Sequence, residues 1–489
     1  MRPTPSFLSM INWSVMVSMG DLGLAGFIAP RIVALMLFPG KQLMTPEVNR
    51  GCLLRPERLL RFLSPSSRGT SLLIATIERL TGLEWKGQST VFLLGLGHGG
   101  IHWTAATLYL LLPFITRDLG LTYTEAGLLV AVFHVSAFAA NFASGLVVDV
   151  TGKRVVFQVL SLAIGAGALL ASGFAQGIWW LVPMVVLIGA TNNLWHPPAI
   201  SFLSEHYPNQ RGYALSIHAL GANVGDAVAP LAAGALLVWV SWRETASLSA
   251  LPIFVVAGMI GVLLSKRDRP ADSSERGGTA EKTGHGMGLA EYFESLKALV
   301  KNRAVLHLSL MAGFRTVAQM GLLIFLPLYL ADVVGMGPLM MGVTMMTLQL
   351  GGVCASPVAG AWSDRIGRRP VVLGGLSITT VLIIVLTLVQ NEVVFIGGVA
   401  VMGFAMYAAR PVIHSWMMDL APPEVAASAT SVMFGVQALF TTIMLAVGGG
   451  VADKWGLQVV FYLLAASMLV ANVLVYMLPN KLPDDASGA

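Results

Sequence analysis

The chain contains one short framework twice, as Gly145-Leu-Val-Val-Asp149-Val-Thr-Gly152-Lys153-Arg154 and as Gly360-Ala-Trp-Ser-Asp364-Arg365-Ile-Gly367-Arg368-Arg369. Each copy lies between two long apolar stretches. Gly152 and Gly367 permit a tight turn between antiparallel helices, because glycine adopts backbone angles that other residues avoid. The basic residues that end each copy favour a membrane surface. The framework therefore predicts two hairpins of membrane-spanning helices.

The other members of the framework have physical roles of their own. Asp149 and Asp364 can bind a basic side chain or a helix N-terminus at the membrane surface. Gly145 and Gly360 are small, so we expect neighbouring helices to approach closely there.

The composition agrees with a membrane protein. Of 489 residues, 55% are hydrophobic and 11% are charged, whereas soluble domains carry about 25% charged residues. This composition excludes a soluble enzyme and a disordered chain. Two cysteines exclude a disulfide scaffold. The net charge is +5, but the basic residues lie in loops between apolar runs, so we expect a lipid bilayer and no nucleic acid as partner.

A bilayer-spanning helix needs about 20 apolar residues. Stretches of this kind, with at most one internal charge, predict an all-α protein with twelve transmembrane helices. They are residues 87–116, 126–148, 155–204 (two spans, broken near Gly173 and Gly177), 212–242, 245–265, 304–331, 333–363, 370–391, 393–418, 425–452 and 455–480.

The distribution of lysine and arginine predicts the orientation. Loops after even-numbered spans, together with the tail, hold fifteen of these residues, and loops on the other side hold three. The basic side is cytoplasmic. We therefore expect a multi-pass protein of the plasma (inner) membrane, with both ends of the twelve-span core in the cytoplasm.

We divide the chain into five parts. Residues 1–90 form an N-terminal extension, read as an interfacial helix plus a basic cytoplasmic segment, with an extra span as the alternative. Residues 91–265 and 304–478 form two six-helix bundles, joined by a cytoplasmic linker over 266–303. Residues 479–489 are a cytoplasmic tail.

The two bundles are repeats of each other. Pro113 and Pro327 are 214 residues apart, as are Pro197 and Pro411. Six spans repeated in one orientation predict two similar bundles about an axis along the membrane normal, with the substrate between them near the midplane.

The paired loops resemble the signature of the major facilitator superfamily, and the similarity covers about residues 91–478. The resemblance implies a transporter whose loop motifs stabilise one access state and break during switching. It makes Gly145, Asp149, Gly152, Lys153, Arg154, Gly360, Asp364, Arg365, Gly367, Arg368 and Arg369 gating residues. Val150 departs from the pattern, because a basic residue is usual there, so the first bundle would hold its lock less tightly.

A narrower resemblance lies in spans 4 and 5. Asn192-Asn193-Leu-Trp-His196-Pro197, Arg211-Gly212-Tyr-Ala and Gly221-Ala-Asn-Val-Gly225 look like the fosmidomycin-resistance branch of that superfamily. The resemblance implies a proton-driven exporter of small molecules.

A charge inside the bilayer is costly, so each one is a candidate for function. Asp226 is the one acid at mid-depth, and we expect it to carry a proton together with His218, eight residues earlier on the same helix face. The alternative is that Asp226 is a structural hydrogen-bond partner of Arg315 or of a nearby amide.

Arg315 and Arg410 favour an anionic substrate, because arginine binds carboxylates and phosphonates through two parallel hydrogen bonds. We expect the substrate site to comprise Arg315, Arg410, His196, Asn192, Asn193 and His102. In the empty carrier, Asp226 would partly neutralise the arginines. Alternatively, each arginine caps carbonyls near kinks that Pro411 or neighbouring glycines create.

The remaining motifs give no cofactor. His98 and His102 share a helix face, but no carboxylate or thiolate accompanies them in that span, so we expect no metal. No Walker A sequence occurs. Gly95-Leu-Gly97-His-Gly99-Gly100 lies inside a span, which favours close helix packing over dinucleotide binding.

The sequence therefore predicts a monomeric, non-enzymatic transporter that exports a small anionic compound or drug in exchange for protons by alternating access. Uptake of an organic anion by proton symport would use the same residues. A non-transporting receptor or assembly protein is also compatible with the sequence, and so is a transition-metal carrier.

Overall fold

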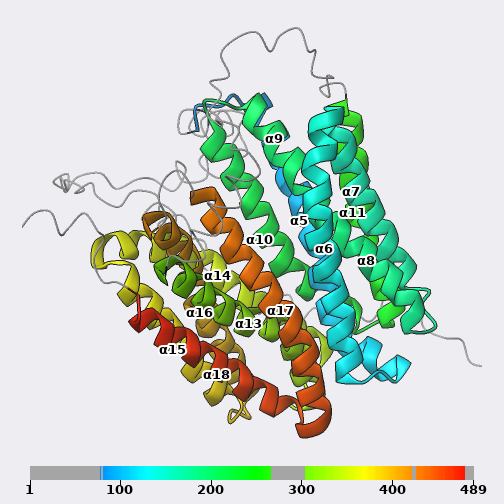
Figure 1. Cartoon of the computed structure of the whole chain (residues 1–489). Coiled ribbons are helices and arrows are strands. Elements are labelled where there is room, and N and C mark those ends of the chain that lie inside the picture. Colours follow the sequence, from blue (N-terminus) through cyan, green and yellow to red (C-terminus); the bar gives the residue numbers. More distant parts are fainter. Residues whose placement is uncertain (1–77, 79–80, 266–302, 421–425, 479–489) are drawn as a thin grey trace, which may run out of the picture. The chain divides into compact units, whose positions relative to one another are not determined.

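The computed structural model describes residue 78 and residues 81–265, 303–420 and 426–478. Most of the predicted N-terminal extension, the linker and the tail lie outside these residues. The described part is helical (Figure 1). Its helices are α5 (Trp85–Leu119), α6 (Tyr123–Thr151), α7 (Arg154–Ser172), α8 (Ile178–Leu194), α9 (His196–His206), α10 (Arg211–Leu236), α11 (Trp242–Leu264), α13 (Arg303–Asp332), α14 (Pro338–Ile366), α15 (Arg368–Leu386), α16 (Glu392–Leu420), α17 (Ala426–Trp455) and α18 (Leu457–Tyr476).

These helices confirm the predicted all-α membrane architecture. Eleven spans in the described ranges are long and apolar enough to cross a bilayer, with α8 and α9 counted as one. The twelfth, α5, is 35 residues long. Its middle contains glycines and two histidines, which lower its hydropathy because this helix packs inside its bundle rather than against lipid.

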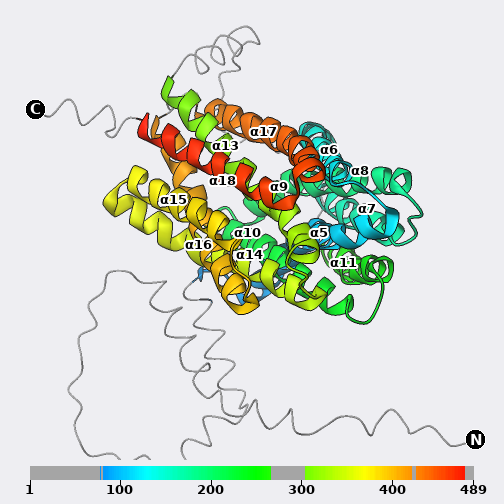
Figure 2. The same ribbon diagram turned by 90° about the horizontal axis from the view of Figure 1, so that it is seen from below.

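The helices form two groups of six spans, coloured blue to green and yellow-green to red in Figures 1 and 2. In the first bundle α5 packs on α10 and α11, while α8 packs on α6 and α7. In the second bundle α13 packs on α17 and α18, while α16 packs on α14 and α15. The bundles meet where α10 contacts α14 and where α6 contacts α17.

Glycine ends the helices at both copies of the repeated framework. Gly152 terminates α6 with φ +66°, and its N–H bonds to the carbonyl of Val148. Gly367 separates α14 from α15 with φ +92°. Both angles lie in the region that favours glycine, so the predicted turns are confirmed.

Close backbone contact joins α5 to α10. A Cβ atom on Gly221 would clash with the carbonyl oxygen of Gly95, and one on Gly225 would clash with that of Gly99. The glycine run of α5 is therefore a packing surface, as expected. Because the backbones approach so closely, short polar side chains on the two helices can reach one another.

Candidate functional site

A cavity of about 710 Å³ lies between the two bundles. Its wall combines α5, α6, α8 and α10 of the first bundle with α13, α14, α16 and α17 of the second. Its polar lining includes His102, His134, Asn192, Asn193, Asn223, Asp226, Thr316, Gln319, Gln349, Tyr407, Arg410 and Gln437. The volume suits a drug-sized molecule.

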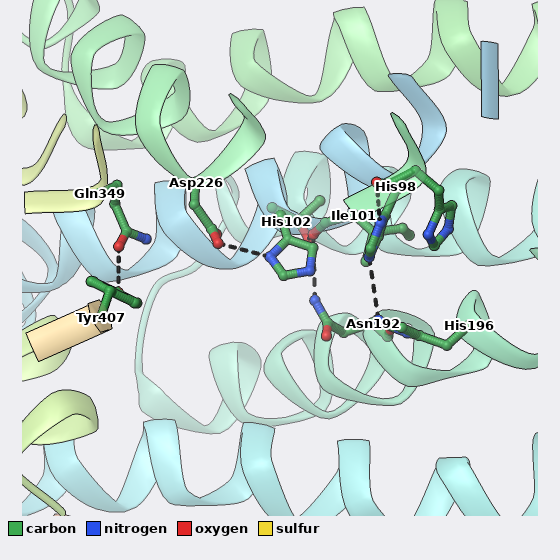
Figure 3. Close-up of polar contacts among 10 residues, drawn as sticks. His98, Ile101, His102, Asn192, His196, Asp226, Gln349 and Tyr407 are labelled. Carbon is green, nitrogen blue, oxygen red and sulfur yellow. Dashed lines mark hydrogen bonds and ion pairs between the residues drawn. The ribbon is translucent and has the colours of Figure 1, made fainter. Parts of the chain in front are cut away.

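The two bundles contribute opposite charges to this wall. Asp226 on α10 is its one carboxylate, and Arg410 on α16 is its one guanidinium. His102 on α5 pairs with Asp226, with 3.0 Å between Nδ1 and Oδ2 (Figure 3). Arg410 is exposed to the cavity and forms no hydrogen bond or ion pair with any described residue.

The expected pairing of Asp226 with the arginines is therefore wrong for this structure. Its partner is His102, because the glycine contact between α5 and α10 brings these two side chains together within one bundle. Both arginines belong to the other bundle.

Arg315 does not line the cavity. It is 4% exposed, and its Nη2 donates to the carbonyl of Met406 at 2.9 Å. Met406 precedes Pro411 by five residues on α16. This contact favours the alternative interpretation of Arg315, in which it caps a carbonyl near the proline.

Four histidines gather behind His102. His98 Nε2 lies 3.3 Å from His196 Nε2, and the His98 ring stacks on that of His218 at 3.9 Å between centroids. His218 Nε2 accepts a hydrogen bond from Trp195 Nε1–H at 3.0 Å. His218 is buried and is not among the lining residues, so it is connected to Asp226 through His98 and His102.

The two asparagines of the expected substrate site face the cavity. Asn192 Nδ2 donates weakly to the carbonyl of Ile101 at 3.5 Å, and Asn193 Nδ2 donates to that of Ala137 at 2.8 Å. Their side-chain oxygens are not engaged in these bonds and can accept from a substrate.

Sequence reasoning missed the amide and phenol groups of the second bundle. Tyr407 donates to Gln349 (Figure 3), and Thr316 donates to Gln437 at 3.1 Å. Our reasoning considered charges and histidines at membrane depth. A search for uncharged polar residues inside the spans would have found these groups.

In the first copy of the framework, Lys153 is the N-cap of α7 and Arg154 is its first residue. Arg154 pairs with Glu205 and donates from Nε to the Ser201 hydroxyl. Both partners lie on α9, so Arg154 ties α7 to α9 within one bundle. The Asp149 side chain and the surroundings of Gly145 lie outside the described part of the chain.

In the second copy, Arg368 is the centre of a network. It pairs with Asp364 and, at 3.1 Å, with Asp419 at the end of α16. Arg369 donates to the carbonyl of Tyr476 at 2.9 Å, and Arg365 is exposed. The expected close helix approach at Gly360 is wrong, since a Cβ there would meet nothing within 4 Å.

The bundles are hydrogen-bonded to each other at the opposite end. Asp453 on α17 accepts from the backbone N–H groups of Tyr123 and Thr124, at 2.7 and 2.9 Å. It thereby caps the N-terminus of α6 from the other bundle. Asp332 accepts from Arg117 at 3.1 Å and from the Tyr123 hydroxyl at 3.0 Å. These contacts close this end of the cavity.

Solved structures share this fold. A bacterial homolog of the human lysosomal transporter Spinster, in an inward-facing and occupied conformation, aligns with a TM-score of 0.65 at 16% identity, covering 80% of this chain and 96% of that one. The peptide transporter POT in complex with sulfate aligns with a TM-score of 0.62 at 16% identity, covering 79% and 94%.

Relatives of known sequence agree. Multidrug resistance protein MdtG of Klebsiella pneumoniae is 24% identical over 419 residues, covering 82% of this chain and 96% of the relative. The uncharacterized MFS-type transporter YfnC of Bacillus subtilis is 24% identical over 377 residues, covering 75% and 87%. The sequence model of the Major Facilitator Superfamily matches residues 91–355 and 308–488. This chain belongs to the Major Facilitator Superfamily and is a multi-pass secondary transporter of small molecules.

Proposed function

We propose that this transporter exports small anionic organic compounds in exchange for protons. The observation that carries the proposal is the unpaired guanidinium of Arg410, which faces the cavity between the bundles. An anion entering the cavity can take two parallel hydrogen bonds from this group. Asn192 and Asn193 on the opposite wall can orient the rest of the molecule.

Asp226 supplies the coupling in this proposal. It is the one carboxylate of the cavity wall, and its partner His102 can accept or release a proton as well. Its other titratable neighbours are Tyr109 and His134 on the wall of the first bundle and Tyr407 and Arg410 on that of the second. Because Asp226 and Arg410 face one cavity, the proton and the anion influence each other's binding through it.

The relatives support export as the direction. Proteins named for multidrug resistance match this chain over most of their length. No nucleotide-binding Walker A sequence occurs in the chain, so an ion gradient is the energy source that fits.

We further propose that the cavity opens to the cytoplasm in this state. Asp332 and Asp453 close the end that lies away from the basic loops, and the loop frameworks at the basic end act as gating elements. In this orientation the linker is cytoplasmic, the protein lies in the plasma membrane, and it works as a monomer.

Purified protein in liposomes tests the proposal. We expect phosphonate and carboxylate antibiotics, followed by mass spectrometry, to move against a proton gradient imposed by a pH step. Movement with the proton would replace export by symport, and no movement with any compound would favour a receptor. The control is the Arg410→Gln variant, which should bind and move anions poorly while neutral compounds are unaffected.

The orientation has an independent test. In a variant with Cys52 and Cys354 changed to serine, Ser274→Cys should react with an impermeant maleimide only after the cells are opened. Labelling of intact cells would reverse the orientation.

A further inference from the structure

Three imidazole rings converge beside the cavity. One ring nitrogen each of His98, His102 and His196 lies within 4.8 Å of the others. His98 and His102 come from successive turns of α5, and His196 begins α9. Sequence reasoning weighed α5 alone, where two histidines without a third ligand are a weak metal site. The fold adds the third imidazole from a helix about a hundred residues away.

Hydrogen bonds fix which nitrogen of each ring carries a proton. Nδ1 of His98 lies 2.8 Å from the carbonyl oxygen of His218, and Nδ1 of His196 lies 3.0 Å from that of Asn192. A carbonyl oxygen only accepts, so both Nδ1 atoms are donors. Nδ1 of His102 likewise faces the carboxylate of Asp226. In a neutral imidazole, the proton on Nδ1 leaves Nε2 with a free lone pair.

The free lone pairs face one another. Nε2 of His98 and Nε2 of His196 are 3.3 Å apart (Figure 3), and two lone pairs at that distance repel unless a cation lies between them. Two nitrogens bound to one tetrahedral Zn²⁺ at 2.0–2.1 Å stand about 3.3–3.4 Å apart. The spacing of the two rings is therefore the spacing of a zinc site.

The surroundings match the outer shell of a metal site as well. Histidines that bind metals almost always donate their other ring N–H to a carboxylate or a backbone carbonyl, which orients the ring and makes the ligand more basic. All three rings do so here. His218 is not a fourth ligand through Nε2, because that nitrogen accepts from Trp195.

We propose that His98, His102 and His196 form a binding site for a divalent transition-metal ion such as Zn²⁺, Co²⁺ or Ni²⁺, with their Nε2 atoms as ligands. Imidazole suits these ions, and three histidines leave a coordination position open for water or another small ligand. His102 lines the cavity, so the ion reaches the site from there.

The ion would tie α5 to the start of α9. Both helices belong to the first bundle, so the site does not cross-link the two bundles and is compatible with alternating access. The site rests on the geometry of the three rings and requires neither the proposed substrate nor the proposed direction of transport.

The test is metal binding to the purified, tag-free protein in detergent, with Cys52 and Cys354 changed to serine and metals removed with a chelator. We expect one Co²⁺ per chain, with the strong visible absorption of tetrahedral cobalt. For bound Zn²⁺, X-ray absorption should show three imidazole ligands. Weakly absorbing octahedral Co²⁺, or no binding, would overturn the site.

Variants locate the ion. His102→Gln and His196→Gln should each weaken Co²⁺ binding more than tenfold, and Asp226→Asn, which changes only an outer-shell partner, by about 10–100-fold. His134→Gln is the matched control, since His134 lines the same cavity outside the cluster, and should bind as the parent does. Thermal melting shows that each variant is folded. Unchanged binding in folded His102→Gln and His196→Gln would refute the assignment, whatever the transport assays show.

Discussion

The two bundles pack their central helices in different ways at equivalent positions of the repeat. In the first bundle, α5 and α10 touch backbone to backbone, at Gly95 against Gly221 and at Gly99 against Gly225. Adding 214 to the last three of these numbers gives Gly435, Gly313 and Leu439 in the second bundle. There a Cβ on Gly313 would meet the rings and methyl groups of α17, while one on Gly435 would meet nothing within 4 Å.

This difference separates the chemistry of the two walls. Close backbones let His102 reach Asp226 directly and bring His98 against His218. In the second bundle the wider spacing leaves room for the cavity, so the polar groups there are at the ends of long side chains such as Arg410. One wall is a preformed polar cluster, and the other holds groups that can reach a ligand.

A second difference lies where the repeat pairs His196 with Arg410. Two prolines follow His196, and the helix is interrupted between α8 and α9 at Trp195. One proline follows Arg410, and α16 continues through it. Each proline removes a backbone donor, so the first site loses two successive bonds. There the His196 ring donates to the carbonyl of Asn192, one turn earlier.

The largest expected effect tests the polar cluster of the first bundle. Asp226→Asn keeps the shape and the hydrogen-bond acceptor for His102 but cannot take up a proton. We expect accumulation driven by a pH gradient to be lost, while exchange of labelled for unlabelled substrate across liposomes continues. Full accumulation in the variant would make Asp226 structural.

The glycine contact itself gives the next largest effect. Gly221→Ala places a methyl group against the backbone oxygen of Gly95, which cannot give way as a side chain could. We expect about 3 kcal/mol of destabilisation, the upper end of the usual cost of overpacking. Gly435→Ala, at the equivalent position of the second bundle, should melt as the parent does. Equal melting temperatures for the two variants would contradict the contrast between the bundles.

Arg410 and Arg315 separate binding from stability in the second bundle. Arg410→Gln should weaken anion binding by about 1.5–3 kcal/mol, the contribution of a hydrogen bond to a charged group. Arg410→Lys should lose less, because the charge remains. Arg315→Gln should leave affinity unchanged and lower the melting temperature, since Arg315 contacts Met406 and not the cavity. Isothermal titration measures the first effect, and unchanged affinity in Arg410→Gln would exclude an anion site.

The smallest effect concerns the contact between the bundles. Asp453→Ala removes the cap on α6, which is worth about 0.5–2 kcal/mol. We expect the population to shift away from this closed end, seen as longer distances between spin labels placed on either side of it. Glu125→Ala is the control, since Glu125 caps the same helix from within its own bundle. Similar distances in both variants would show that Asp453 is not part of the closure.

The amino-acid sequence by itself determined the spans and their pairing into a repeat. Long charge-free stretches have one stable solution in a bilayer, the helix, because backbone groups cannot be satisfied otherwise. Gly152 and Gly367 marked the turns for an equally local reason. Asp226 and Arg410 were also identifiable, since a charge at membrane depth stands out against its neighbours.

Only the tertiary structure decided which of these groups meet. Asp226 pairs with His102 rather than with an arginine because α5 and α10 touch through glycines. Arg315 faces a carbonyl rather than the cavity because of where α13 lies against α16. The three histidines converge because α9 begins beside α5. Such contacts depend on the rotation and spacing of helices far apart in the chain, which hydropathy and periodicity do not specify.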